Sequence, residues 1–285
     1  MMDVLPHREF FMLSAAFYML AFAVGVRAFL LHRRYSQPWM QVLLVLGWAL
    51  QFIGLSLRGR DAGGCPLGNG FELLQFLAWS AVFLYFVVGP SFRMSLLGFL
   101  SAGLAAILGL VALIPRSWDA PYVSRWLGSD PLTEAHAALA VFSYGVFGLL
   151  ALVGLMYWMQ HRDLKQHKRS IWYDLLPPII QLDVIGLRLL TTGWVLLSVS
   201  LLLGAGLYLL GSIEGLEAKL AMTWGVWLGY AVLWVLRVRG RITGMTMARM
   251  GWWLFVLALF SLWAVETGRR VSRSSAEPVR LMDLP

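Results

Sequence analysis

The chain has 285 residues, of which 59% are hydrophobic and only 13% are charged. Soluble domains carry about 25% charged residues, so this composition excludes an ordinary soluble protein. The charges are clustered, and the apolar runs between them reach about 18 residues or more, which is long enough to cross the hydrocarbon core of a bilayer. Runs of this length indicate helices, whose backbone hydrogen bonds are satisfied internally. We therefore predict an all-α, polytopic transmembrane helical bundle.

The formal net charge of +8 does not indicate nucleic-acid binding. The basic residues fall in short loops between apolar runs, which is the distribution that sets orientation in a membrane. The single cysteine, Cys65, excludes an intramolecular disulfide and a paired-cysteine metal site. The first apolar run is long and follows a segment of mixed charge, so we expect a retained span rather than a cleaved signal peptide.

About eight spans are expected in one integral membrane domain, residues 1–285. In chain order they cover about residues 10–31, 40–57, 71–90, 94–114, 136–159, 189–210, 220–236 and 250–265. Pro90 and Pro115 end the third and fourth runs, because proline does not continue a helix. A Gly-rich loop separates the second run from the third. The polar tail, residues 267–285, is expected to be disordered.

The segment between the fifth and sixth spans, residues 160–188, is basic and is expected to be cytoplasmic. Its end, residues 179–189, is predicted to form an amphipathic helix that lies at the membrane interface. Asp183 and Arg188 are in helical register there, and we expect them to form an ion pair.

The loops after the first, third, fifth and seventh spans hold more arginine and lysine than the other loops. This asymmetry places the first set of loops in the cytoplasm. The N-terminus, the Cys65 loop, Glu72 and His136 are then expected on the outer face. Four arginines in the tail favour the opposite orientation. We assign the orientation from the loops.

Four segments of the chain form a distinctive series of motifs. They are Cys-Pro-Leu-Gly-Asn-Gly-Phe-Glu at 65–72 running on to Trp79; His136 followed by Phe-Ser-Tyr-Gly at 142–145; Leu-Pro-Pro at 176–178 through Leu-Asp at 182–183, with Gly193 and Gly-Ala-Gly at 204–206; and Lys219 through Trp224 to Gly-Arg at 240–241. No single motif is specific, but their order and spacing together are, and they cover about residues 58–265. In this order the segments resemble the cytochrome c assembly family, which includes CcsA-type and shorter HemX-like membrane proteins.

Two departures from the CcsA-type pattern make the chain more similar to the HemX-like branch. The tryptophan-rich loop that binds haem in CcsA-type proteins corresponds to residues 211–219, which include Lys219 but no tryptophan. No histidine follows His167, so the second outer axial ligand of those proteins is missing. Haem synthase activity is therefore not expected. The sequence also contains no Walker loop, HExxH motif or Ser-His-Asp set, and catalytic residues are not assigned.

The resemblance implies that His136 ligates haem iron, since imidazole is a common axial ligand. The alternative is an interfacial polar residue that begins a helix, with Glu134 in the first turn. Glu72 would orient His136 through a hydrogen bond. The alternative for Glu72 is a carboxylate favoured by the helix dipole, and Asn69 is expected to cap the same helix.

Haem is apolar except at its propionates, so a cleft between helices at the membrane surface would bury the macrocycle. Arg58, Arg60 or Arg125 would then meet the propionates. Cys65 is expected to be inert, and the alternative is an unusual thiolate ligand.

The resemblance favours a protein of cytochrome c biogenesis or haem homeostasis that binds or relays haem at the extracytoplasmic face of a bacterial cytoplasmic membrane. Its expected partners are membrane lipid, haem, and a membrane protein or another component of cytochrome c maturation or haem synthesis. The alternative is a non-catalytic structural or regulatory subunit that keeps the family scaffold without haem. A transporter is less favoured, because interrupted helices and inverted repeats are not evident.

Overall fold

The computed structural model describes residues 7–30, 37–89, 95–119, 131–166, 176–209 and 217–261. Within these ranges the ordered elements are helices and none is a strand, which confirms the all-α prediction. The helices are α1 (Arg8–Leu30), α2 (Gln37–Ala62), α3 (Gly70–Val88), α4 (Ser95–Leu113), the 3-10 helix η2 (Arg116–Asp119), α5 (Pro131–Gln166), α6 (Ile179–Leu209), α7 (Glu217–Val238) and a final helix, Gly244–Ser261.

Seven of these helices are long and apolar enough to cross a membrane. They are α1 to α6 and the final helix, and the apolar part of α7, Met222–Val238, is shorter. Together they account for the predicted set of about eight spans. Arg125, residues 167–175, the loop 211–216 and the tail 267–285 lie outside the described residues.

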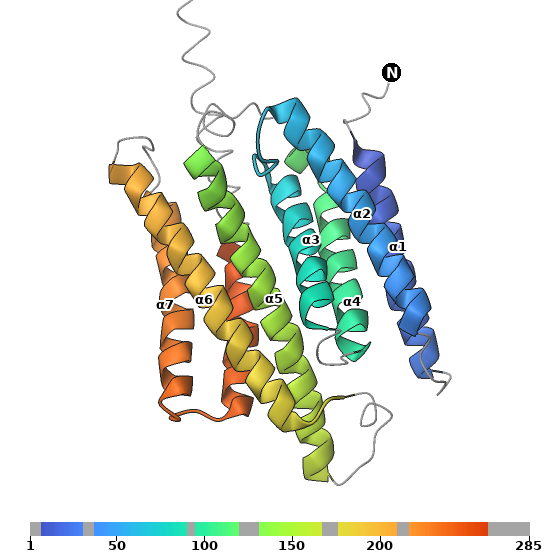
Figure 1. Ribbon diagram of the computed structural model, residues 1–285, viewed down its shortest axis with the longest axis vertical. Coiled ribbons are helices and arrows are strands. Elements are labelled where there is room, and N and C mark those ends of the chain that lie inside the picture. Colours follow the sequence, from blue (N-terminus) through green and yellow to red (C-terminus); the bar gives the residue numbers. More distant parts are fainter. Residues whose placement is uncertain are drawn as a thin grey trace, which may run out of the picture.

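The helices run alternately up and down in one bundle (Figure 1). In the N-terminal group, α1 packs on α2 and α4, and α3 packs on α4. In the C-terminal group α6 packs on α5 and α7, and the contact between α3 and α5 joins the two groups. We call the end at the top of Figure 1, with the α2–α3 loop and the start of α5, the upper end, and the opposite end the lower end.

The upper end contains the residues that were expected to share one face. The start of α1, the Cys65 loop, the first turn of α3, η2 and the start of α5 all lie there (Figure 1). Which side of the membrane the upper end faces stays a prediction from the charge distribution.

Small residues let some of the helices approach closely, as is usual in membrane bundles. A Cβ atom at Gly193 of α6 would lie 2.5 Å from the Phe147 ring of α5, and one at Gly229 would lie 2.7 Å from Leu254. Gly206 and Gly225 have no neighbour within 4 Å of such an atom among the described residues. Gly193 and Gly229 therefore lie at close helix contacts, whereas no such contact is found at Gly206 or Gly225 in that part of the chain.

The expected interfacial helix at 179–189 is not a separate element, because α6 runs without a break from Ile179. Asp183 pairs with Arg237 at the end of α7, so the predicted pair with Arg188 is wrong. Arg237 also donates to the Ile242 carbonyl at 3.1 Å. Because the end of α7 packs beside the start of α6, Asp183 pairs with Arg237 and not with Arg188, which is its neighbour in helical register.

We expect Arg237→Gln to destabilise the protein by about 1–3 kcal/mol, the usual range for losing a hydrogen bond to a charged partner. The midpoint of thermal unfolding in detergent would fall by several degrees. Arg188→Gln is the matched control, because Arg188 is exposed and also lies near Asp183 in the sequence. An equal fall for both variants would contradict the assignment of Arg237 as the partner.

Candidate functional site

The loop between α2 and α3 is shaped by a glycine and a helix cap. Gly63 has a φ of +68°, a left-handed conformation that lets the chain turn after α2. The Asn69 side chain accepts a hydrogen bond from the Glu72 backbone N–H at 2.8 Å, which confirms the predicted cap. The Glu72 carboxylate in turn accepts from the Gly68 N–H at 2.8 Å. These reciprocal bonds fix where α3 begins.

A buried charge network lies behind this loop. Arg58 of α2 is only 7% exposed, and its Nη1 lies 2.5 Å from Asp119 Oδ1 and 3.6 Å from Glu72 Oε1. The other oxygen of Asp119 accepts from Arg8 Nη1 at 2.9 Å. The Arg58 guanidinium also lies over the Phe71 ring, 4.4 Å from its centroid. One carboxylate thus joins α1, α2 and η2, while Glu72 links α3 to the same arginine.

This network changes the roles expected of two residues. Arg58 was expected to meet haem propionates, but its guanidinium already faces Asp119 and Glu72, with which an external anion would have to compete. Glu72 was expected to bond His136, yet the partners found for its carboxylate among the described residues are Gly68 and Arg58. The contacts of the Glu72 carboxylate among the described residues therefore hold the loop, and none of them is to His136.

His136 lies in the second turn of α5, against α6. Its Nδ1–H donates to the Ser200 backbone carbonyl at 2.7 Å. A carbonyl oxygen only accepts, so the proton belongs on Nδ1 and Nε2 keeps its lone pair. The Ser200 hydroxyl lies 3.1 Å from the same nitrogen and donates to the His136 carbonyl at 2.9 Å. Among the described residues, Nε2 has no hydrogen-bond partner.

Gly204, one turn beyond Ser200 on α6, makes room for this ring. A Cβ atom at Gly204 would lie 2.6 Å from His136 Cε1 and 3.0 Å from Nδ1. The absence of a side chain at Gly204 therefore accommodates the imidazole. Sequence reasoning missed Ser200, although its spacing of four residues from Gly204 places both on one face of a helix. The signal in the sequence was a hydroxyl residue, Ser200, and a glycine, Gly204, on the same face of one helix.

Cys65 lies half-buried in the loop beside α3. Burial, followed by the nearby Glu134 and Glu72 carboxylates, raises the pKa of the Cys65 thiol to about 11. A thiol is a poor metal ligand until it loses its proton, so this environment favours the expected inert cysteine over a thiolate ligand.

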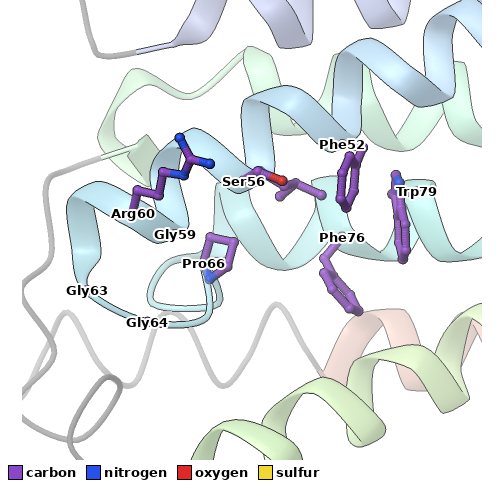
Figure 2. A pocket seen from close by; sticks show the side chains of 10 residues that line it. Phe52, Ser56, Gly59, Arg60, Gly63, Gly64, Pro66, Phe76 and Trp79 are labelled. Carbon is purple, nitrogen blue, oxygen red and sulfur yellow. The ribbon is translucent and has the colours of Figure 1, made fainter.

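An open pocket of about 430 Å³ lies between α2 and α3 near the upper end (Figure 2). Phe52, Phe76 and Trp79 form its apolar wall, and Arg60 and Pro66 lie toward the loop (Figure 2). The Phe52 and Trp79 rings stack, with centroids 5.9 Å apart. Such a pocket suits a flat apolar ligand with an anionic end. His136 is not part of its lining, so the pocket and the histidine are separate features of the upper end.

The described residues contain no group of three His, Cys, Asp or Glu side chains that could hold a metal ion. His161, on the same helix at the lower end, is exposed and stacks with Tyr157.

We expect Asp119→Asn to be strongly destabilising, because it leaves the Arg8 and Arg58 guanidinium groups without their shared carboxylate. Removing one partner of a buried ion pair costs about 3–5 kcal/mol, which thermal unfolding in detergent would detect. Asp61→Asn is the control, because Asp61 is 60% exposed and pairs with His7 at the same end. Equal effects of the two substitutions would show that the network does not stabilise the fold.

The raised pKa of Cys65 predicts slow alkylation. Below the pKa of an ordinary thiol, about 8.5, the thiolate fraction of Cys65 would be roughly three hundredfold smaller than that of free cysteine. The alkylation rate should rise tenfold per pH unit and level off only near a pH of about 11. Alkylation quenched at several times and followed by mass spectrometry measures the rate at each pH, with the denatured protein as the control. A rate that levels off near the ordinary thiol pKa would contradict the prediction.

Comparison with known proteins links this arrangement to a family. Residues 67–270 match the family described as cytochrome C assembly protein. Protein HemX of Brevibacillus brevis is 32% identical over 183 residues, which are 64% of this chain and 67% of that relative. Protein HemX of Bacillus subtilis is 27% identical over 220 residues, 76% of this chain and 79% of the relative.

A more distant similarity extends to the cytochrome c biogenesis protein CcsA of Chlamydomonas reinhardtii. It is 27% identical over 162 residues, which are 53% of this chain and 43% of that protein. The resemblance inferred from the sequence motifs is confirmed, and since the family match spans well over half of the chain, this multi-span membrane protein belongs to the cytochrome c assembly family.

Proposed function

We propose that this protein binds or relays haem at the upper end of the bundle, on the extracytoplasmic face of a bacterial cytoplasmic membrane, in cytochrome c biogenesis or haem homeostasis. The observation that carries the proposal is the His136 imidazole, which has a fixed Nδ1–H and an unengaged Nε2. Similarity to HemX proteins and to a cytochrome c biogenesis protein supports the choice of haem as the ligand.

The environment of His136 suits axial ligation of iron. Metal-ligating histidines commonly donate their other N–H to a carbonyl or carboxylate, which fixes the ring and makes the ligating nitrogen more basic. The Ser200 carbonyl takes that role here, and Gly204 leaves space for the ring. Haem proteins use such a histidine to hold the iron. One histidine would make a one-sided contact, which suits a protein that releases haem as well as binding it.

The cations available to haem propionates differ from those first expected. Arg60 is exposed and lines the pocket beside the α2–α3 loop, so it is the favoured contact for a carboxylate. Arg58 would keep the loop and α3 in place through Asp119 and Glu72. Arg125 remains a candidate in the segment that follows η2.

The second candidate function is a structural or regulatory subunit without haem. It is favoured by the commitment of Arg58 and Glu72, two of the expected site residues, to contacts within the protein. A partner membrane protein, or a component of cytochrome c maturation or haem synthesis, would then be the ligand of this scaffold.

The two functions are separated by the absorption spectrum of the purified protein after expression with ample haem. The haem-binding function predicts a Soret band, and His136→Ala should lower the affinity for haem at least about tenfold, as expected for losing a metal ligand. His161→Ala is the matched control, because it removes an exposed histidine from the same helix. Wild-type protein without pigment would favour the structural subunit, and equal binding by both variants would exclude His136 as the ligand.

Two glycine variants test, by the same absorption measurement, whether the position of the His136 imidazole matters for haem binding. Gly204→Ala should displace the imidazole and weaken haem binding several-fold, because the added Cβ would lie 2.6 Å from Cε1. Gly206→Ala makes the same chemical change where no atom of the described residues lies within 4 Å of the added carbon, and it should leave the Soret band unchanged. Equal spectra for the two variants would show that the position of the imidazole found here is not the one that matters for haem.

A further inference from the structure

A groove lies at the opposite end of the protein, between α5 and the final helix. It has a volume of about 360 Å³ and is lined by Gly154, Leu155, Trp158, Ala248, Arg249, Trp252 and Trp253. The two helices nearly touch at its base, since a Cβ atom at Gly154 would lie 3.2 Å from the Ala248 carbonyl oxygen. The Trp253 side chain is 66% exposed, so the groove opens outward from the bundle.

Arg249 is unusual because it is an exposed charged residue inside a candidate membrane span. It lies within the candidate span Gly244–Ser261 and is exposed on the surface of the bundle. None of the ion pairs found among the described residues includes it. A guanidinium on the lipid-facing side of a span is costly unless it reaches an anion or the headgroup region. Arg249 is the sixth residue of this helix, so its side chain can reach the headgroup region, where lipid phosphates supply the anion that the described residues do not.

Arg162 provides a second cation beside the same groove. Its guanidinium lies 5.7 Å from the centroid of the Trp158 ring, one helical turn earlier on α5, and it too forms none of the ion pairs found in the described part of the chain. Tryptophans are typical of the membrane–water interface, where lipid headgroups lie. The two guanidinium groups and the tryptophans at this end are therefore side chains of the kind that suit the headgroup region.

We infer that this groove binds one anionic glycerophospholipid. Its phosphate would accept hydrogen bonds from Arg249 and Arg162, because guanidinium groups match phosphate oxygens in geometry and charge. An acyl chain would lie along Trp158, Trp252 and Trp253. Basic pockets between membrane helices are known to bind anionic headgroups. The site is independent of the proposed haem function, which concerns the upper end.

A lipid is favoured over a partner helix for a physical reason. A neighbouring protein would have to bring a carboxylate to the depth of Arg249, and acidic side chains facing lipid in a span are rare and costly. Every anionic phospholipid already carries its phosphate at the interface, next to an apolar chain. The groove combines the same two features, a cationic part and an aromatic part, in one place.

The test is native mass spectrometry of the full chain in detergent with equal amounts of phosphatidylglycerol and phosphatidylcholine that share the same acyl chains. The wild-type protein should retain phosphatidylglycerol preferentially. Arg249→Gln and Arg162→Gln should each reduce this preference, roughly fivefold per arginine. Arg241→Gln is the matched control, because Arg241 is an exposed arginine at the same end but outside the groove.

Equal retention of the two lipids by the wild-type protein would overturn the inference, as would an equal loss of preference in Arg241→Gln, which would indicate non-specific attraction. Leu155→Trp fills the groove without changing its charge and should lower retention of phosphatidylglycerol. Unchanged retention in that variant would place the lipid elsewhere. A lipid-free dimer of wild-type protein that dissociates in Arg249→Gln would identify a second copy as the occupant, contrary to the inference.

Discussion

The Asp119 carboxylate is the contact on which the upper end of the bundle depends. It faces Arg58 of α2 through one oxygen and Arg8 of α1 through the other. A buried guanidinium is tolerated only with a partner, so α1, α2 and η2 must come together for any of these charges to be buried. Arg58 then reaches Glu72, whose carboxylate holds the Gly68 backbone. The charge network and the cap of α3 are therefore one connected structure.

The imidazole of His136 belongs to a different part of the same end. It is positioned by a backbone carbonyl and by the missing side chain of Gly204, both on α6. The packing of α3 on α5 brings the two parts together. Glu72 therefore holds the α2–α3 loop, whereas Ser200 positions the His136 imidazole.

The two ends of the protein satisfy their charges in different ways. At the upper end, Asp119 and Glu72 neutralise Arg8 and Arg58 within the protein. At the lower end Arg237 has an internal partner, Asp183, whereas Arg162 and Arg249 lie beside tryptophans at the outer surface. A charge at membrane depth needs a counter-charge, and the surrounding lipid can provide one. The internal pairs hold the bundle together, while the outer arginines are available to the membrane.

The sequence by itself determined the helical class, the number of spans and the cap at Asn69. These depend on the length of apolar runs and on residues close together in the chain. It also singled out His136, through its resemblance to the family. Only the tertiary structure decided its partner, because Ser200 is 64 positions away. Asp119 was missed for the same reason, since its partners are 61 and 111 positions distant. Helical register suggested Arg188 for Asp183, but the docking of α7 on α6 supplies Arg237 instead. Local periodicity specifies each helix, whereas the pairing of side chains depends on how the helices pack.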